Sequence, residues 1–150
     1  MWLYKGKQIS CIEDLGQPTP FGFVYITTHI PTGIAYIGKK ALKHKVKKKL
    51  TKKELAEQTG PGRKSTFKHI YKESDWKTYY GSEASIKASI KEGRQKEFTR
   101  EILQLVYDKK LLTYYECKYM FAFGVLEHPK KYLNSNILGK FFTVDFMVRK

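Results

Sequence analysis

Two tyrosines and a lysine-rich segment are the first residues whose types and spacing could do chemistry. Tyr25 and Tyr36 lie in the segment GFVYITTHIPTGIAYIGKK, residues 22–40. Directly after it, nine of the fifteen residues from 39 to 53 are lysine. Strand tyrosines are common and often pack their rings in a core, with the hydroxyl reaching water. Two phenols beside so much positive charge instead favour an anionic partner.

A single acid on an apolar helix is the second candidate. The segment LLTYYECKYMFAF is apolar at positions 111, 112, 115, 119, 120, 122 and 123. At about 100° per residue these positions form one broad face of a helix, and Glu116 projects within it. A carboxylate on an apolar face is costly unless it is paired, protonated or bound to a metal. The ordinary explanation is an ion pair, for example with Arg100 or a neighbour of Lys118.

A β-hairpin must position the two tyrosines. The runs FVYITT and IAYIG are rich in β-branched and aromatic residues, and the residues between them supply Pro and Gly for a turn. A loop of residues 29–32 would pair Thr28 with Gly33 and place Tyr25 opposite Tyr36, on the same face. A slip of one residue would send one tyrosine to the other face.

The remaining elements are predicted from local signals. Residues 39–58 are helix-prone, and a Thr51–Glu54 capping box predicts a second helix from about residue 52 to Gly60-Pro61-Gly62. Ser82 is a good N-cap for a helix that stops at Gly93. Residues 98–108 read as the third strand of the sheet.

The side chains of these elements show which faces are covered. In the strand 98–108 we expect Leu103, Leu105 and Tyr107 on one face and Ile102 and Val106 on the other, so that both faces of the strand are partly covered. Residues 1–20 read as a short strand, a turn and a linker that pack on the sheet edge, and Trp76 and Tyr80 are expected in a core.

Length and composition limit the class of protein. One hundred and fifty residues suggest one domain, and 41% hydrophobic with 15% aromatic residues exclude a disordered chain. The net charge of +15 favours nucleic acid or an anionic membrane surface. No apolar run approaches the ~20 residues of a spanning helix, and the first residues lack the apolar core of a signal peptide, so a cytoplasmic location is expected. Cys11 and Cys117 are expected to be free thiols.

Basic residues after the hairpin are candidates for nucleic-acid contact. A solvated helix face or a flexible basic loop is the alternative for the lysine run. Between residues 62 and 80, basic side chains interleave with aromatic rings, which suits phosphate neutralisation with stacking as well as a small satellite core. The candidate contact residues are Lys39, Lys43, His44, Lys47, Lys48, Lys64 and Lys68.

Two motifs resemble those of a known family. Gly22-Phe23-Val24-Tyr25 followed by Tyr36-Ile37-Gly38 resembles the paired signature of the GIY-YIG endonucleases, with one extra residue in its first half. The segment YYGSEASIKASIKEGRQKEFTREIL resembles the stretch after the hairpin in phage and mobile-element members. The resemblance covers roughly residues 22–142. It implies an α+β fold with a small antiparallel sheet of about three strands flanked by helices, in one domain over 1–150 with an N-terminal extension 1–20 and a basic insertion at about 41–75.

The resemblance also implies an activity, metal-dependent hydrolysis of DNA phosphodiester bonds. Glu116 would hold one Mg²⁺ or Mn²⁺ ion, Tyr36 would serve as base or position the water, and Tyr25 would assist it. Asn134, which follows an aromatic residue by two positions, would lie near the active site, with Asn136 as the alternative. The substrate would be double-stranded DNA, met in the host cytoplasm if the protein is phage-encoded.

One departure from the family concerns an arginine. Members usually carry an Arg on the helix after the second motif, where this chain has lysines. Either Arg63 folds back into the site or a lysine such as Lys40 substitutes, although a lysine lacks the planar two-point contact of a guanidinium. Sequence specificity would come from the basic insertion or from a homodimer, or would be slight.

Two other functions would also explain the positive charge of this chain. A non-catalytic basic nucleic-acid-binding protein would need the lysines and aromatics, and a packaging protein would need only the lysines. Neither needs Glu116 inside an apolar helix face.

Overall fold

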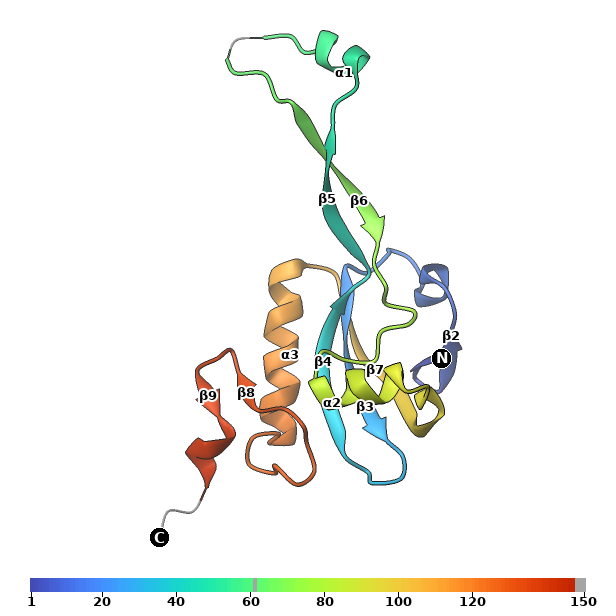
Figure 1. Cartoon of the computed structure of the whole chain (residues 1–150), viewed down its shortest axis with the longest axis vertical. Coiled ribbons are helices and arrows are strands. Elements are labelled where there is room, and N and C mark those ends of the chain that lie inside the picture. Colours follow the sequence, from blue (N-terminus) through green and yellow to red (C-terminus); the bar gives the residue numbers. More distant parts are fainter. Residues whose placement is uncertain (61, 148–150) are drawn as a thin grey trace.

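A five-stranded sheet organises the chain in the computed structural model, which describes residues 1–60 and 62–147 (Figure 1). The strand order is β2-β1-β7-β3-β4, with β3 antiparallel to both neighbours and β1 parallel to β7. The bounds are Trp2–Tyr4 (β1), Lys7–Ile9 (β2), Gly22–His29 (β3), Ala35–Ala41 (β4) and Phe98–Val106 (β7).

The α+β class is confirmed, but the expected count of three strands is wrong. The N-terminal segment supplies two further strands, β1 and β2, at the sheet edge, where one short strand, a turn and a linker were expected. Trp2 and Ile9 bury their side chains there, which anchors the β1–β2 hairpin to the sheet.

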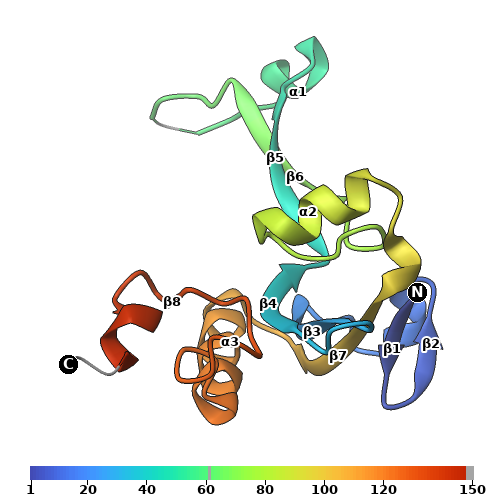
Figure 2. The ribbon, with the colours of Figure 1, turned by 60° about the horizontal axis from the view of Figure 1, so that its bottom comes forward.

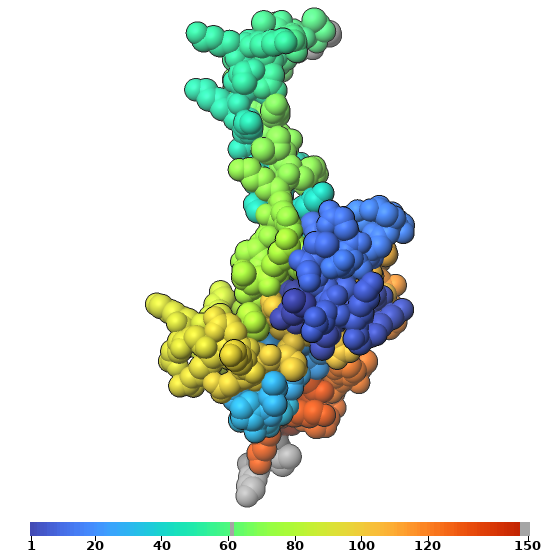
Figure 3. Space-filling model, turned by 90° about the vertical axis from the view of Figure 1, so that its right-hand side faces the viewer, coloured from blue at the N-terminus to red at the C-terminus, as the bar shows by residue number. Residues whose placement is uncertain are grey.

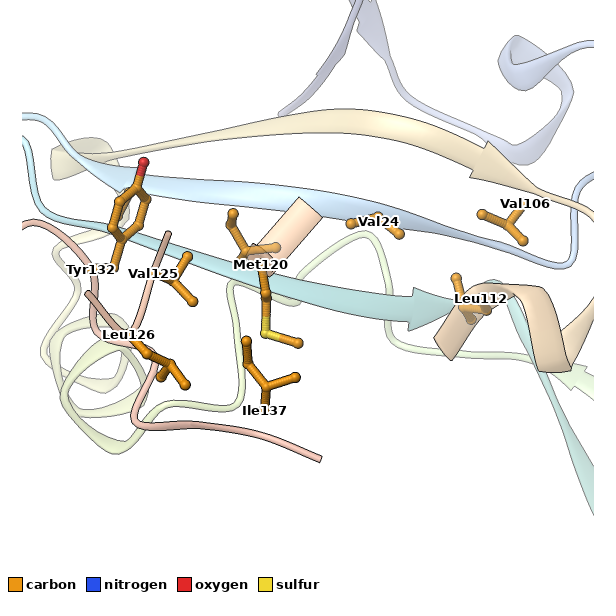
Figure 4. Close-up of a cluster of buried hydrophobic side chains, with 10 residues drawn as sticks. Val24, Val106, Leu112, Met120, Val125, Leu126, Tyr132 and Ile137 are labelled. Carbon is orange, nitrogen blue, oxygen red and sulfur yellow. The ribbon is translucent and has the colours of Figure 1, made fainter. Parts of the chain in front are cut away.

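Helices and loops cover both faces of the sheet, so two apolar clusters form (Figure 2). Helix α3 (Lys109–Phe123) packs on one face, where Val24 and Ile37 meet Leu112 and Met120 (Figure 4). On the other face Phe23 and Tyr25 pack with side chains that include Trp76, as expected for a core position. Helix α2 (Ala84–Lys91) lies on this second side.

The register of the β3–β4 hairpin differs from the expected one by two residues. Tyr36 pairs with Thr27, and Tyr25 pairs with Gly38. Because the shift is an even number of residues, both tyrosines still share one face, with ring centroids 6.5 Å apart. The glycine opposite Tyr25 explains the register, since a Cβ on Gly38 would lie 2.4 Å from the Tyr25 hydroxyl oxygen.

A β-bulge changes the expected faces of β7. Val24 pairs with Gln104 but Tyr25 pairs with Ile102, so Leu103 is an extra residue on β7. The inserted residue reverses the alternation. Ile102 and Leu105 therefore reach the Tyr25 side, while Leu103 and Val106 reach α3. The expected alternation was wrong, whereas both faces are partly covered as predicted.

Most of the lysine-rich segment forms a strand. The expectation that residues 39–58 are helical is therefore wrong for the residues before 52. Strand β5 (Lys43–Lys49) pairs antiparallel with β6 (Phe67–Glu73), and the two form a hairpin that projects from the body (Figure 1). In a helix, lysines four residues apart would repel each other on one face. In a strand the same residues lie about 13 Å apart.

The helices mostly follow their signals. Helix α1 (Lys52–Ala56) begins with the expected Thr51–Glu54 capping box but ends before Gly60; Pro61 lies outside the described residues. Helix α2 is capped by the Glu83 carboxylate rather than by Ser82. On α3 the expected apolar face is partly wrong, because Leu111, Ala122 and Phe123 are exposed.

The remaining elements are short. They are η1 (Ile12–Leu15), η2 (Gln95–Glu97), β8 (Asn136–Ile137), β9 (Phe141–Phe142) and η3 (Thr143–Phe146). Cys11 and Cys117 are free thiols, as expected. In residues 1–60 and 62–147 no helix has the length and apolar character needed to cross a bilayer.

Candidate active site

A polar cavity of about 410 Å³ lies along the free edge of β4. Strand β4 is the last strand of the sheet, so side chains from both of its faces can reach around this edge. Tyr36 comes from the face of Tyr25, and Glu116 comes from α3 on the opposite face. The lining residues include Tyr36, Ile37, Ser82, Glu116, Asn134 and Asn136.

Tyr36 presents its hydroxyl to this cavity. The hydroxyl oxygen lies 2.8 Å from Ser82 Oγ in a hydrogen bond. Burial raises the pKa of Tyr36, with further contributions from Tyr79 and Glu116, while the Ser82 hydrogen bond opposes the shift. The protein alone therefore keeps this phenol protonated at neutral pH.

Glu116 lies on the buried side of α3, one turn from Leu112 and one turn from Met120, both of which are buried. Burial raises the pKa of its carboxyl group, and the charge and backbone N–H of Lys39 oppose the shift. The Lys39 ammonium donates a hydrogen bond to Thr113 Oγ1 at 2.6 Å. In the part of the chain that the structure describes, Glu116 belongs to none of the ion pairs.

Arg100, the expected ion-pair partner of Glu116, is used elsewhere. Its guanidinium donates hydrogen bonds to the carbonyl oxygens of Lys77 and Tyr79, at 2.9 and 2.8 Å. The guanidinium also stacks against the rings of Trp2 and Tyr80, 4.6 and 3.9 Å from their centroids. The ion-pair explanation through Arg100 is therefore wrong.

Asn134 fixes the second signature motif to the rest of the site. Its side-chain oxygen accepts a hydrogen bond from the Ile37 N–H at 3.0 Å, and its amide nitrogen donates to the Ile37 carbonyl at 2.8 Å. The side chain thus pairs with the free edge of β4 as a neighbouring strand would. Asn134 is buried and lines the cavity together with Tyr36.

Tyr25 lies behind Tyr36 rather than in the cavity. It is 1% exposed, and its ring packs edge-on against Trp2, Phe23 and Tyr79. Burial raises its pKa strongly, with smaller contributions from Tyr79, Tyr36 and Glu116. The Tyr25 hydroxyl is therefore close enough to Tyr36 and Glu116 to interact with them electrostatically.

Sequence reasoning did not single out Ser82, which lines the cavity, or Tyr79, which packs against Tyr25. The Tyr79 ring lies 6.0 Å from that of Tyr25, and the Lys40 ammonium lies 4.1 Å above it. Ser82 was expected to cap a helix but instead bonds to Tyr36. A signal existed, because both belong to the Tyr-x-Gly-Ser turn of the segment that resembles the family.

The other expected site residues lie at different distances from the cavity. Lys40 pairs with Asp75 at 2.6 Å and is not a lining residue of the cavity. Arg63 lies in the loop between α1 and β6, at the far end of the projecting hairpin, so it does not fold back into the site (Figure 1). The same hairpin carries Lys43, His44, Lys47, Lys48, Lys64 and Lys68.

The donor set fits at most one weakly held hard cation. In the described ranges 1–60 and 62–147 no cluster of three or more His, Cys, Asp or Glu residues could hold a metal. Glu83 borders the cavity, but its carboxylate accepts hydrogen bonds from the backbone of α2. Mg²⁺ usually keeps several waters and uses one or two carboxylates together with substrate phosphates. Glu116 in a polar cavity is compatible with that pattern.

Tyr36 on the edge strand and Glu116 on helix α3 line the same cavity of a small α+β structure. A family model described as "Putative endonuclease segE, GIY-YIG domain" matches residues 2–137. The chain therefore belongs to the SegE GIY-YIG family of endonucleases. No curated protein and no solved structure matched the chain.

Proposed function

We propose that the protein is a divalent-metal-dependent endonuclease that hydrolyses phosphodiester bonds of double-stranded DNA. Membership of an endonuclease family supports DNA cleavage in general. The observation that carries the finer proposal is the half-buried Glu116, which faces Tyr36 across one polar cavity and has no ion-pair partner among the described residues. Burying a carboxylate in this way costs stability, so a functional role explains it better than a structural one.

Each residue of the site has a task in this proposal. Hydrolysis forms a bond between a water oxygen and phosphorus and breaks the bond to one ester oxygen. Glu116 would hold the ion, which supplies Lewis-acid stabilisation of the charge that develops on the phosphoryl group. Tyr36 hydrogen-bonds the attacking water, and Ser82 holds the phenol in place.

The raised pKa of Tyr36 limits how this phenol can act. Lys39 and Lys40 follow on the same strand and donate hydrogen bonds to Thr113 and Asp75. The phenol positions the water while protonated, and it accepts the water's proton only when bound positive charge lowers its pKa.

Nicking of supercoiled plasmid tests the proposal. We expect the wild-type protein to convert the plasmid to the nicked form with Mg²⁺ or Mn²⁺ and to leave it intact in EDTA. Nicking that persists in EDTA would contradict the metal requirement. DNA binding without any cleavage would leave the non-catalytic binding protein as the correct reading.

A further inference from the structure

The hairpin projects from the body (Figure 3), and its register gives it two chemically different faces. Residues directly opposite each other on an antiparallel pair share a face, so the observed register assigns every side chain. We call one side the ribbon face; it carries Lys43, Lys45, Lys47, Lys49, Phe67, His69, Tyr71 and Glu73. The opposite face carries His44, Val46, Lys48, Lys68, Ile70 and Lys72.

The ribbon face combines exposed cations with exposed rings. Tyr71 is 65% exposed and Phe67 is 38% exposed. The Lys47 ammonium lies 4.1 Å above the Phe67 ring. Glu73 is the acid of this face and lies at the base of the hairpin, where its carboxylate accepts a hydrogen bond from Trp76 Nε1 and pairs with Lys77. The charges of Lys45, Lys47 and Lys49 are therefore available to an anionic partner.

On the opposite face, other parts of the protein neutralise or bury more of the side chains. Lys68 forms an ion pair with Glu54 of the α1 segment. Val46 and Ile70 pair directly and are half-buried. Lys48 and Lys68, both DNA-contact candidates from the sequence, lie on this side.

The ribbon face continues into two basic clefts on the body. A cleft of about 470 Å³ at the base of the hairpin is lined by residues that include Lys45, Tyr71 and Lys109. A second cleft, of about 320 Å³, shares Lys109 and adds Lys39 and Lys40 of β4. Lys39 in turn lies close enough to Glu116 for its charge to affect that carboxyl group. A basic path thus connects the hairpin with the cavity edge.

We propose that duplex DNA lies along this path, with the ribbon face of the hairpin in the major groove to one side of the scissile phosphate. A two-stranded ribbon fits the major groove, which is about 12 Å wide. Seven-residue strands span about 23 Å, or roughly two-thirds of a helical turn of DNA. The inference rests on the proposed function only for the position of the scissile phosphate.

Matched lysine variants test this geometry by equilibrium binding to duplex DNA in EDTA. Lys45→Ala removes a charge from the ribbon face, and Lys72→Ala removes one from the opposite face nearby. Lys109→Ala removes the lysine shared by the two clefts, whereas its exposed neighbour Lys110 lines neither. If Lys45 and Lys109 each neutralise one phosphate, each loss weakens binding about 8-fold at ~0.1 M salt and reduces the salt slope by about 0.9.

The controls decide the outcome. We expect Lys72→Ala and Lys110→Ala to bind within about twofold of wild type. If Lys45→Ala and Lys72→Ala weaken binding equally, or if Lys109→Ala and Lys110→Ala do, the proposed DNA path is overturned. It is also overturned if Lys45→Ala and Lys109→Ala have no effect, or if the wild type does not bind duplex DNA. Stronger face-dependent binding to single-stranded DNA would overturn the duplex assignment. Because no step requires cleavage, a protein that never nicks DNA could still satisfy this test, and a nuclease could fail it.

Discussion

Replacing Glu116 by glutamine separates a metal ligand from a structural ion pair. The substitution keeps the shape of the side chain and removes its charge. Breaking a buried ion pair strands the partner charge and typically costs about 3–5 kcal/mol. For a chain of this size that loss would lower the melting temperature by roughly 6–20 °C.

The environment of Glu116 predicts the opposite result. Burial raises the pKa of its carboxyl group in the folded protein, so the folded state binds the proton more tightly than the unfolded chain. The stability of the metal-free wild type should therefore fall as the pH rises from the ordinary glutamate range through the raised pKa. Glu116→Gln removes this pH dependence and should be at least as stable as wild type at neutral pH.

The Glu116→Gln protein should lose DNA cleavage but retain DNA binding. We expect nicking with Mg²⁺ or Mn²⁺ to fall at least about 100-fold, since metal-ion charge stabilisation is worth several kcal/mol. DNA affinity in EDTA should be unchanged or tighter, because one negative charge is gone. The exposed Glu101 of β7 offers a charge-matched control, and Glu101→Gln should nick at the wild-type rate. A Glu116→Gln protein that is destabilised yet still cuts DNA would refute the reasoning.

Three further substitutions test the other parts of the site. Tyr36→Phe should remain folded in thermal melts but nick plasmid about 100-fold more slowly or worse, the usual range for general acid–base help; full activity would remove the hydroxyl from the mechanism. Gly38→Ala should destabilise the protein by about 1–3 kcal/mol in urea titrations, because its new Cβ would overlap the ring and hydroxyl of Tyr25. Asn134→Ala should cost about 2–3 kcal/mol by the same assay, since it leaves the backbone of Ile37 without two hydrogen bonds; an unchanged midpoint would contradict either of these two predictions.

Local patterns were enough to predict the β3–β4 hairpin and the helices α1, α2 and α3. The turn between Thr28 and Ala35, the capping box at Thr51 and the stop at Gly93 each depend on residues close in sequence. The single acid on α3 was also visible, because helical periodicity alone shows which residues surround it.

Long-range pairing was not predictable from these patterns. The residues of strand β5 pair with residues 18 to 30 positions later, and β1 pairs with a strand nearly a hundred residues away. Lysine has no strong strand preference of its own, so only the pairing with β6 turns this segment into a ribbon. The bulge at Leu103 likewise arises from the contact with β3.

The residues that line the cavity were predicted where chemistry and sequence pattern coincided and were missed where long-range packing decided their positions. Tyr36 and Glu116 meet at the cavity, although they come from opposite faces of the sheet. Tyr25 turned inward because Gly38 leaves space for its ring. Arg63 was considered only for its residue type, and a projecting hairpin now separates it from the cavity.

Single-turnover cleavage started by metal tests the central claim most directly. The protein is first bound to duplex DNA in a metal-free buffer, so that binding is complete before any reaction. Addition of Mg²⁺ should then produce a rapid burst of cut DNA with wild type, a much slower one with Tyr36→Phe and none with Glu116→Gln. Equal bursts from the three proteins would contradict the assignment of the cavity between β4 and α3 as the active site.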